Sequence, residues 1–440
     1  MAYDNQQQNN PEELRKQQQV RQALARRQQR FLRRFCGICV GVVALLVLCV
    51  ALVRSCERKP DTSTTLPATT QPSQTTAPSQ PPQGQTVISI VAGGDVNVTD
   101  QVIAAGETAG GYDFSHLFMD VLPLFANADA AIVNFEGNLV GAPYGSQNAS
   151  APLELMQALK QAGVDLVQMA NSYSIKNGIL GLNTTLERIR QTGLEPVGAC
   201  SSQEEYERTE GFTIKNINGV RVALVAFTKG MGGLSLPSGS QNRVNLLYQD
   251  YATSYRKIDE EGIQATLAAV EAQQPDVTIA LLHWGSEHKS IVSDNQKTIT
   301  KLMLDGGVDT IIGTHSHYVQ GVDFDPESGT VVAYSLGDLL GDGTITDTNY
   351  SIVLQLQITK DHTTGQTRIT DCGYTPVYML TQGRDGVPLR LVRLETAMAM
   401  YENNHVDRVS LKAYENMKTA MSRIKSKTAA FPERKGGEGT

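Results

Sequence analysis

The stretch "IIGTHSHYVQG" at residues 311–321 decides how the rest of the chain is interpreted. It begins as an apolar run typical of a buried strand, and it then places His315 and His317 two residues apart. At about 3.3 Å per residue of strand, two imidazoles with this spacing can lie on the same side of the chain. Because the chain has only seven histidines, the pair directs attention to the polar residues that end other strands.

Short, β-branched apolar runs recur along the chain and predict the strands of one folded region. The runs are 87–93, 130–137, 164–170, 220–228, 277–285, 308–315 and 331–338. Most are continuous rather than alternating, as expected for strands that are covered on both faces. The helices predicted between them are 152–162, 179–192, 256–273 and 293–306.

These elements predict a single α/β domain at 87–390, with helices layered around central sheets. Residues 351–359 and 368–380 alternate more and have no helix between them, which predicts an antiparallel portion. Within 391–440, residues 395–424 predict a C-terminal helix and residues 425–440 a loose tail.

The N-terminal region predicts a membrane anchor. Residues 1–34 are rich in Gln and Arg and predict a basic tail, which the uncharged run 35–53 follows. As a helix rising about 1.5 Å per residue, this run matches a bilayer core of about 30 Å. Arginines crowd its N-terminal flank, at Arg26, Arg27, Arg30, Arg33 and Arg34. The positive-inside tendency therefore predicts a single-pass cell-membrane protein with a cytoplasmic N-terminus and an extracellular C-terminal domain.

Two other interpretations of the N-terminus stay open. A cleaved signal peptide is one, although the leader is long and no small-x-small cleavage site is present. A lipoprotein is the other; it would use Cys56, but Arg54 lies in the stretch that should hold small residues. A permanent anchor fits the sequence better than either.

Beyond the anchor, composition limits the class of partner. Residues 54–86 are rich in Pro, Thr, Ser and Gln and predict an extended linker. Residues 60–440 carry a net charge of −14 against +7 for residues 1–59, and an acidic exterior argues against nucleic acid as a partner. Only Cys200 and Cys372 lie beyond the N-terminal region, so no disulfide scaffold is predicted and their pairing is left open.

Polar residues recur where the predicted strands end. They are Asp95, Asn134, Glu136, Asn171, His283, Glu287, His315, His317 and Asp338. In open α/β sheets ligands bind at the carboxyl ends of strands, so we expect these side chains on successive ends of one sheet. Each motif alone is more often a chance match, a turn or a helix cap. Their recurrence favours a site with carboxylate and imidazole ligands for divalent metals.

The same residues carry a resemblance to a known family. The pieces are "GGDV", "NFEG", "ANSYSIKNG", "LLHWGSE", "DGGVDTIIGTHSHYVQG" and "YSLGDLL", in this order between residues 88 and 340. They resemble the CapA family of poly-γ-glutamate capsule synthesis proteins, whose domain is similar to calcineurin-like metallophosphoesterases. An anchor followed by an exterior domain also resembles the family's layout in Gram-positive bacteria.

The resemblance implies a four-layer metallophosphoesterase-like domain, two mixed sheets between helices, with two divalent ions (Mn, Fe or Zn). Carried over by position, it implies that Asp95 and His317 bind one metal and that His283 and His315 bind the other. Glu136 would bridge the ions or lie close to them. Such a pair would activate water for attack on a phosphorus or carbonyl centre. Two further residues are implied to orient histidines or substrate, namely Glu287 and Gln320.

One loop departs from the family's pattern. Where the family usually has Ala-Asn-Asn-His-x-x-Asp-x-Gly, this chain reads "ANSYSIKNG", with Ser172, Tyr173 and Lys176 in place of an amide, an imidazole and a carboxylate. Tyr173 would then have to serve as the acid, and a phenol with a pKa near ~10 gives up its proton less readily than an imidazole at pH 7. Asn171 sliding in as the amide ligand is an alternative. Asp338 also stands where the family commonly has Asn.

Three functions are compatible with these observations. The first is an anchored, metal-dependent hydrolase or transferase acting on a cell-surface polymer or phosphoester, alongside capsule-synthesis membrane proteins. The second is a non-catalytic protein that binds or organises the polymer with a degraded metal site. The third is a structural tether between membrane and wall. The retained carboxylates and histidines favour the first over the third, and the altered loop favours the second over a conventional phosphoesterase.

Overall fold

The computed structural model describes residues 84–381, 389–403, 409–428 and 431–434. The predicted basic tail, the apolar run 35–53 and the linker up to residue 83 lie outside the described residues. Among the helices that are described, none combines the length and the apolar character needed to cross a membrane.

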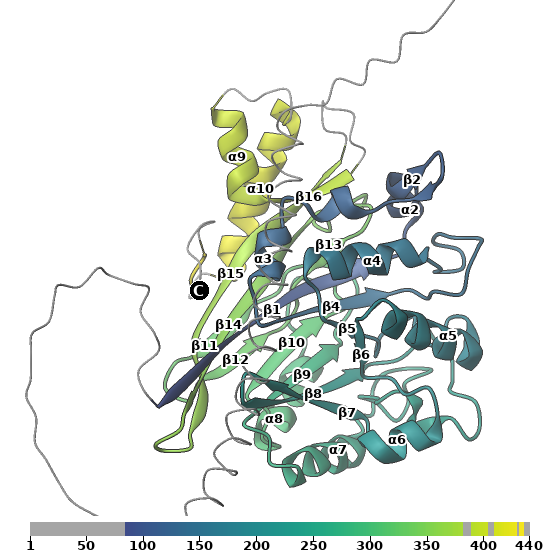
Figure 1. Cartoon of the computed structure of the whole chain (residues 1–440), viewed down its shortest axis with the longest axis vertical. Helices are drawn as coiled ribbons and strands as arrows, with labels where there is room; N and C mark the ends of the chain where they lie inside the picture. The colour runs from purple at the N-terminus through teal and green to yellow at the C-terminus, as the bar shows by residue number, and fades with distance from the viewer. Residues whose placement is uncertain (1–83, 382–388, 404–408, 429–430, 435–440) are drawn as a thin grey trace, which may run out of the picture. The chain divides into compact units, whose positions relative to one another are not determined.

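An eight-stranded sheet forms one half of the domain (Figure 1). Its order is β16-β15-β14-β1-β4-β5-β6, with β13 paired to β1 beside that path. The strands are Gln85–Asn97 (β1), Ala130–Glu136 (β4), Leu166–Gln168 (β5), Glu195–Val197 (β6), Asp338–Leu340 (β13), Tyr350–Asp361 (β14), Thr367–Thr381 (β15) and Leu389–Arg393 (β16). Strands β1, β4, β5 and β6 are parallel, whereas β14 pairs antiparallel with β1 and β15. The antiparallel portion predicted for 351–359 and 368–380 is therefore confirmed.

A six-stranded sheet forms the other half, in the order β11-β12-β10-β9-β8-β7. Its strands are Phe212–Ile217 (β7), Val220–Thr228 (β8), Val277–His283 (β9), Thr310–Thr314 (β10), Val322–Asp325 (β11) and Thr330–Ala333 (β12). The central strands β8, β9, β10 and β12 are parallel, and each edge strand is antiparallel to its neighbour. A short pair, Glu107–Thr108 (β2) and Gly111–Tyr112 (β3), lies apart from both sheets.

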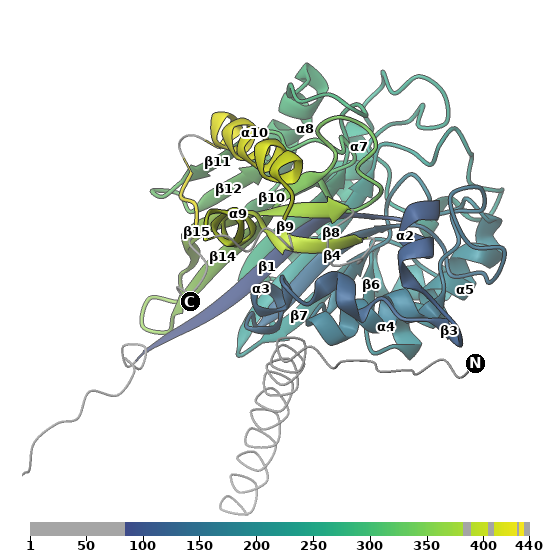
Figure 2. The same ribbon diagram turned by 90° about the horizontal axis from the view of Figure 1, so that it is seen from above.

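Side-chain alternation in the six-stranded sheet separates two cores. On β8, Val222 and Leu224 belong to the core shared with the eight-stranded sheet. Their neighbours Val225 and Phe227 face helices Glu260–Ala272 (α7) and Asp294–Asp305 (α8), through side chains such as Leu267. Figure 2 shows these helices on the side of the sheet away from β1. A strand buried on both faces must be apolar throughout, which explains the continuous runs in the sequence.

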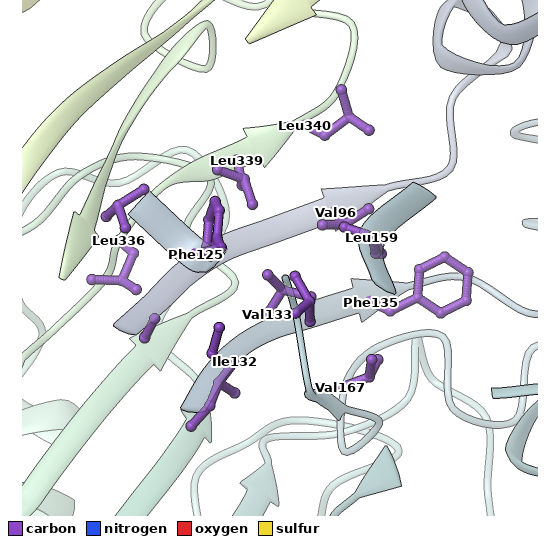
Figure 3. Close-up of a cluster of buried hydrophobic side chains, with 14 of the residues drawn as sticks. Val96, Phe125, Ile132, Val133, Phe135, Leu159, Val167, Leu336, Leu339 and Leu340 are labelled. Carbon is purple, nitrogen blue, oxygen red and sulfur yellow. The ribbon is translucent and has the colours of Figure 1, made fainter. Parts of the chain in front are cut away.

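Helices also cover the outer face of the eight-stranded sheet. Figure 3 shows Phe125 of Leu122–Ala126 (α3) and Leu159 of Leu153–Ala162 (α4) next to Val133 of β4. Other helices before the C-terminal part are Asp100–Gly106 (α2), Gly178–Gln191 (α5), Gln203–Thr209 (α6), and the short turns Ser115–Phe118 (η1) and Gln241–Arg243 (η2). An α/β fold with mixed sheets is therefore confirmed.

The C-terminal part differs from the prediction. Two helices, Leu394–Glu402 (α9) and Leu411–Lys427 (α10), are present where one helix was predicted at 395–424. The hydroxyl of Thr428, just after α10, donates to the Tyr374 hydroxyl at 2.8 Å, which ties this end to β15. Phe431 is buried although it lies in the predicted loose tail, because it stacks on Tyr374 with ring centroids 5.9 Å apart.

A close backbone approach fixes the end of β1. The amide of Asp95 donates to the carbonyl of Gly337 at 3.1 Å, just before β13 begins. A Cβ atom on Gly94 would lie 1.8 Å from that same carbonyl oxygen. Only glycine fits at position 94 without moving the backbone that carries Asp95.

Replacing Gly94 with alanine should therefore destabilise the domain. Overpacking of this kind costs about 1–3 kcal/mol, and we expect the free energy of unfolding to fall by at least that much. Urea unfolding can be followed by fluorescence of Trp284, the single tryptophan, which is fully buried. The matched control is Gly110→Ala, because a Cβ there meets no atom within 4 Å. Equal stabilities of the two variants would contradict the close approach.

Candidate metal centre

The strand-end side chains come from two sheets, and the prediction that they share one sheet is wrong. Asp95 and Glu136 end β1 and β4 of the eight-stranded sheet, whereas His283 ends β9 and His315 follows β10 of the six-stranded sheet. The backbone amide of His315 donates to Asp95 Oδ2 at 3.0 Å, so β1 and β10 meet at their ends. Strands buried on both faces have the same apolar sequence in either sheet, which is why the sequence did not separate them.

One group of potential ligands consists of Glu136, His283 and His315, all of them buried. One ligand atom from each lies within 4.8 Å of the others. His283 Nε2 is 3.0 Å from His315 Nδ1 and 3.5 Å from Glu136 Oε1. His283 Nδ1 is held by the Thr314 hydroxyl at 3.1 Å, which directs Nε2 into the group.

A second group consists of Asp95, His317 and Asp338, again with ligand atoms within 4.8 Å of one another. His317 Nδ1 lies 2.8 Å from Asp338 Oδ1. The pairing of β1 with β13 sets Asp338 opposite Asp95, so register brings both carboxylates together. His315 and His317 have φ values of +89° and +61°, and this left-handed backbone delivers the two imidazoles to different groups.

Asn134 lies between the two groups, and the sequence analysis did not assign it as a ligand. Its Nδ2 donates to Asp95 Oδ1 at 2.6 Å and lies 3.4 Å from Glu136 Oε1 and 3.4 Å from His283 Nδ1. The β1–β4 register sets it opposite Asp95. Its place two residues before Glu136 on the same strand was the feature that could have identified it, because alternate residues share a face.

Asn171 supports Asn134 rather than replacing a ligand. Its Nδ2 donates to Asn134 Oδ1 at 3.0 Å and to the carbonyl of Phe135 at 2.7 Å. Its Oδ1 accepts from the amide of Tyr173 at 2.9 Å. In this structure the Asn171 amide group bonds to protein groups, and its use as a metal ligand stays a prediction.

Burial sets the charges of both groups. It raises the pKa of Asp95 to about 6, against the lowering effect of His317, and it raises the pKa of Glu136 and of Asp338 as well. Burial lowers the pKa of His283 well below the ordinary histidine value. Burial would also lower the pKa of His317, but the carboxylates of Asp338, Glu136 and Asp95 raise it to about 10.

The donor set fits divalent cations. Three buried carboxyl groups, on Asp95, Glu136 and Asp338, surround one charged imidazole, and burial raises the pKa of each carboxyl group because it disfavours the ionised form. A cation in each group would favour the ionised carboxylates that act as ligands. Burial also lowers the pKa of His283 and His315, which favours the neutral imidazole that a metal requires. Mixed carboxylate and imidazole donors suit Mn, Fe or Zn.

The three residues predicted to assist catalysis lie in different places. Tyr173 and Glu287 line a pocket of about 440 Å³ that also contains His315. Gln320 is buried elsewhere; its Oε1 accepts from Gln296 at 2.9 Å and its Nε2 donates to the carbonyl of Lys289 at 2.8 Å. These bonds tie the start of α8 to the loop that follows β9, so Gln320 positions backbone and does not contact the two groups through them.

The departing loop lies against the first group. The hydroxyl of Ser172 is 3.1 Å from His283 Nε2, so the serine does reach this group. Burial, followed by the carboxylates of Glu136 and Glu287, raises the pKa of Tyr173 to about 12. A phenol with that pKa keeps its proton at neutral pH and is a weaker donor than the sequence alone suggested.

Two adjoining groups of buried carboxylates and imidazoles, held between two α/β sheets, define a candidate metal-binding domain. The chain belongs to the family described as bacterial capsule synthesis protein PGA_cap, whose model matches residues 89–343, more than half of its length. Both groups lie inside the matched range. The predicted membership of the CapA family is thereby confirmed.

Characterised relatives agree with this assignment. The chain is 29% identical over 265 residues to the capsule biosynthesis protein CapA of Bacillus anthracis, covering 57% of this chain and 60% of that protein. It is 27% identical over 254 residues to the PGA biosynthesis protein CapA of Bacillus subtilis (strain 168), covering 56% and 62%. The matched region therefore spans less than two thirds of the length of these relatives.

Two solved structures have a distant likeness. The calcineurin-like phosphoesterase YfkN of Bacillus subtilis aligns at 15% identity and a TM-score of 0.37, over 77% of this chain and 99% of that chain. A phosphatase of Mycoplasma pneumoniae aligns at 14% identity and a TM-score of 0.39, over 66% and 94%.

Metal-free protein should lose stability at high pH through His317. Its folded pKa of about 10 lies above the ordinary 6.5, so its stabilisation is full below pH 6.5 and is lost as pH rises through 10. We expect the free energy of unfolding of the chelator-treated chain to fall more steeply between these pH values than that of His317→Gln. Trp284 fluorescence in urea provides the measurement, and exposed His362→Gln is the matched control. Identical pH slopes for wild type and His317→Gln would show that the ion pair is not formed.

Proposed function

We propose that this chain is a metal-dependent hydrolase that acts in the synthesis of a capsule polymer, poly-γ-glutamate or a related cell-surface polymer. The observation that carries the proposal is the pair of adjoining ligand groups, Glu136–His283–His315 and Asp95–His317–Asp338. Family membership supports the biological setting, because the relatives are capsule and PGA biosynthesis proteins. The layering of two sheets between helices supports the four-layer metallophosphoesterase-like arrangement.

Each group supplies a defined part of the chemistry. When bound, two divalent ions would polarise the substrate and activate water for attack on a phosphorus or carbonyl centre. The Thr314 hydroxyl holds the His283 ring so that Nε2 faces Glu136 and His315. Asp338 Oδ1 accepts the proton at His317 Nδ1, and the charged ring must lose its second proton, at Nε2, before that nitrogen can bind a metal.

The pocket beside the first group would receive the substrate. Tyr173 Oη keeps its proton at neutral pH and can donate a hydrogen bond to a substrate oxygen, although proton transfer from it is slow. Ser172 occupies the side of His283 Nε2, where the family usually has an amide. We therefore expect slow turnover compared with a member of the family that has histidine at position 173.

The proposal includes the cellular setting expected from the sequence. The run 35–53 would anchor the chain in the cell membrane of a Gram-positive bacterium, with the N-terminus in the cytoplasm and the domain outside. The linker at 54–86 would then hold the domain away from the bilayer, within reach of the polymer and of capsule-synthesis membrane proteins.

A non-catalytic role in binding or organising the polymer is the second candidate. The observation that favours it is the loop at 171–177, where Tyr173 has its pKa raised to about 12 and Lys176 replaces a carboxylate. In this role the metal site would be degraded and the cleft would serve to bind the polymer. The two candidates therefore differ in turnover and in metal content.

Metal content and turnover should both depend on the two histidines after β10. We expect the full chain, purified in detergent and reconstituted with Mn, to hold two equivalents of metal by elemental analysis and to hydrolyse a phosphodiester. His315→Ala and His317→Ala should each lose about one equivalent and lower turnover by at least a hundredfold, because each removes a ligand from a different group.

His362→Ala is the matched control, since this histidine is exposed on the turn after β14. One equivalent of metal or none in the wild-type chain, without turnover, would support the non-catalytic role. Full metal content in both of the alanine variants at 315 and 317 would refute the metal centre itself.

A further inference from the structure

The pocket beside His315 has features that the metal chemistry does not use. It has a volume of about 440 Å³, and two lysines line it, Lys176 and Lys229. Lys176 is exposed at the mouth, whereas Lys229 is half-buried and follows β8 directly. A cationic pocket is unexpected on a stretch, residues 60–440, with a net charge of −14.

Lys229 is held in position without a direct ion pair, although the Glu287 carboxylate acts on it at longer range. Its Nζ donates to the carbonyl of Gly285 at 2.6 Å and lies 4.5 Å above the centre of the Tyr255 ring. Within the described residues, no carboxylate oxygen lies within 4.0 Å of the ammonium of Lys229 or of Lys176. An ammonium has three donors and only one is committed here, so two remain for a ligand.

The backbone just after Lys229 is closely packed. A Cβ on Gly230 would lie 2.3 Å from the carbonyl oxygen of Tyr251 and 2.7 Å from Tyr255, so the turn after Lys229 requires glycine. The segment continues through Gly232, which also lines the pocket and has a φ of +60°. The turn therefore places Lys229 beside His315 rather than in solvent.

We infer that this pocket is an anion subsite, in which Lys229 and Lys176 hold a carboxylate or phosphate group of the substrate beside Glu136, His283 and His315. The inference rests on the proposed function and specifies it: the substrate carries negative charge next to the bond that is processed. Charge-assisted hydrogen bonds from a half-buried ammonium are stronger than those from an exposed one. Lys229 is therefore the main anchor, and Lys176 adds attraction at the entrance.

Glu287 reduces the net positive charge of the subsite. It lines the same pocket and is exposed. Two lysines and one glutamate leave a single positive charge, which suits one anionic group and disfavours a second. Removing the glutamate should therefore strengthen anion binding, an effect opposite in sign to removing a lysine.

The test measures anion binding to the full chain in detergent after its metals have been removed by chelation, so that metal ions do not contribute. The probes are inorganic phosphate and γ-linked triglutamate, titrated by calorimetry at low and high salt. Lys229→Met should weaken binding at least tenfold, and Lys176→Met about threefold, the difference expected between half-buried and exposed charges. Glu287→Gln should tighten binding, and Lys229→Arg should retain most of it.

Lys412→Met is the matched control, because this exposed lysine lies on α10 and makes the same change of charge. If only phosphate shows binding that depends on the lysines, the subsite is assigned to a phosphate group. If only triglutamate does, it is assigned to a carboxylate group. The subsite is refuted if wild type binds neither probe, or if Lys229→Met, Lys176→Met and Lys412→Met all bind like wild type. Metal content measured in the same variants separates the two proposals, since loss of the metal centre leaves these anion data intact.

Discussion

Three carboxylates buried where two sheets meet are the constraint on which the rest of the structure depends. Asp95, Glu136 and Asp338 are all nearly inaccessible to solvent, and burial raises the pKa of each. Leaving such charges uncompensated is costly, so the surrounding structure must supply positive charge and hydrogen bonds. The Asn134 amide, the His315 backbone amide and the His317 imidazole supply part of it. A pair of divalent cations would supply the remainder.

The ends of the strands bring the side chains of the candidate site together. The pairing of β1 with β4 and β13 places Asn134 and Asp338 on either side of Asp95, and the end of β10 brings its histidines to the same place. The pocket lies on one side of the first group, bordered by the altered loop and by the turn after β8. In the proposed function, the metal groups would activate water and the lysines would hold negative charge on a neighbouring part of the same bound molecule.

The sequence predicted the fold class and identified the candidate ligand residues. Both predictions were possible because long buried strands and polar strand ends are local features of a sequence. It did not separate the two sheets, since strands covered on both faces have one apolar pattern in either. The short strand β6, "EPV", was not predicted, because three residues carry no periodicity and Pro196 argues against a strand. The break between α9 and α10 was also missed: 395–424 has no proline, and the capping residues Asn403 and Ser410 were not used as helix-end signals.

At the site, the limits of prediction were geometric. The assignment of His315 and His317 to different groups depends on their positive φ values, which cannot be predicted from the residue type. The place of Asn134 depends on register, and the burial that raises the pKa of Tyr173 depends on packing around the loop. The pocket lysines are far apart in sequence, at 176 and 229, so only the fold places them together.

Two divalent cations are expected to bind where the eight-stranded and six-stranded sheets meet. Anomalous diffraction from a crystal grown with manganese, recorded on either side of the Mn absorption edge, tests it most directly. We expect two anomalous-difference peaks, one among Glu136, His283 and His315 and one among Asp95, His317 and Asp338. They should be separated by about 3.5–4 Å, as in two-metal sites. An empty site, or ions held elsewhere on the acidic surface, would contradict it.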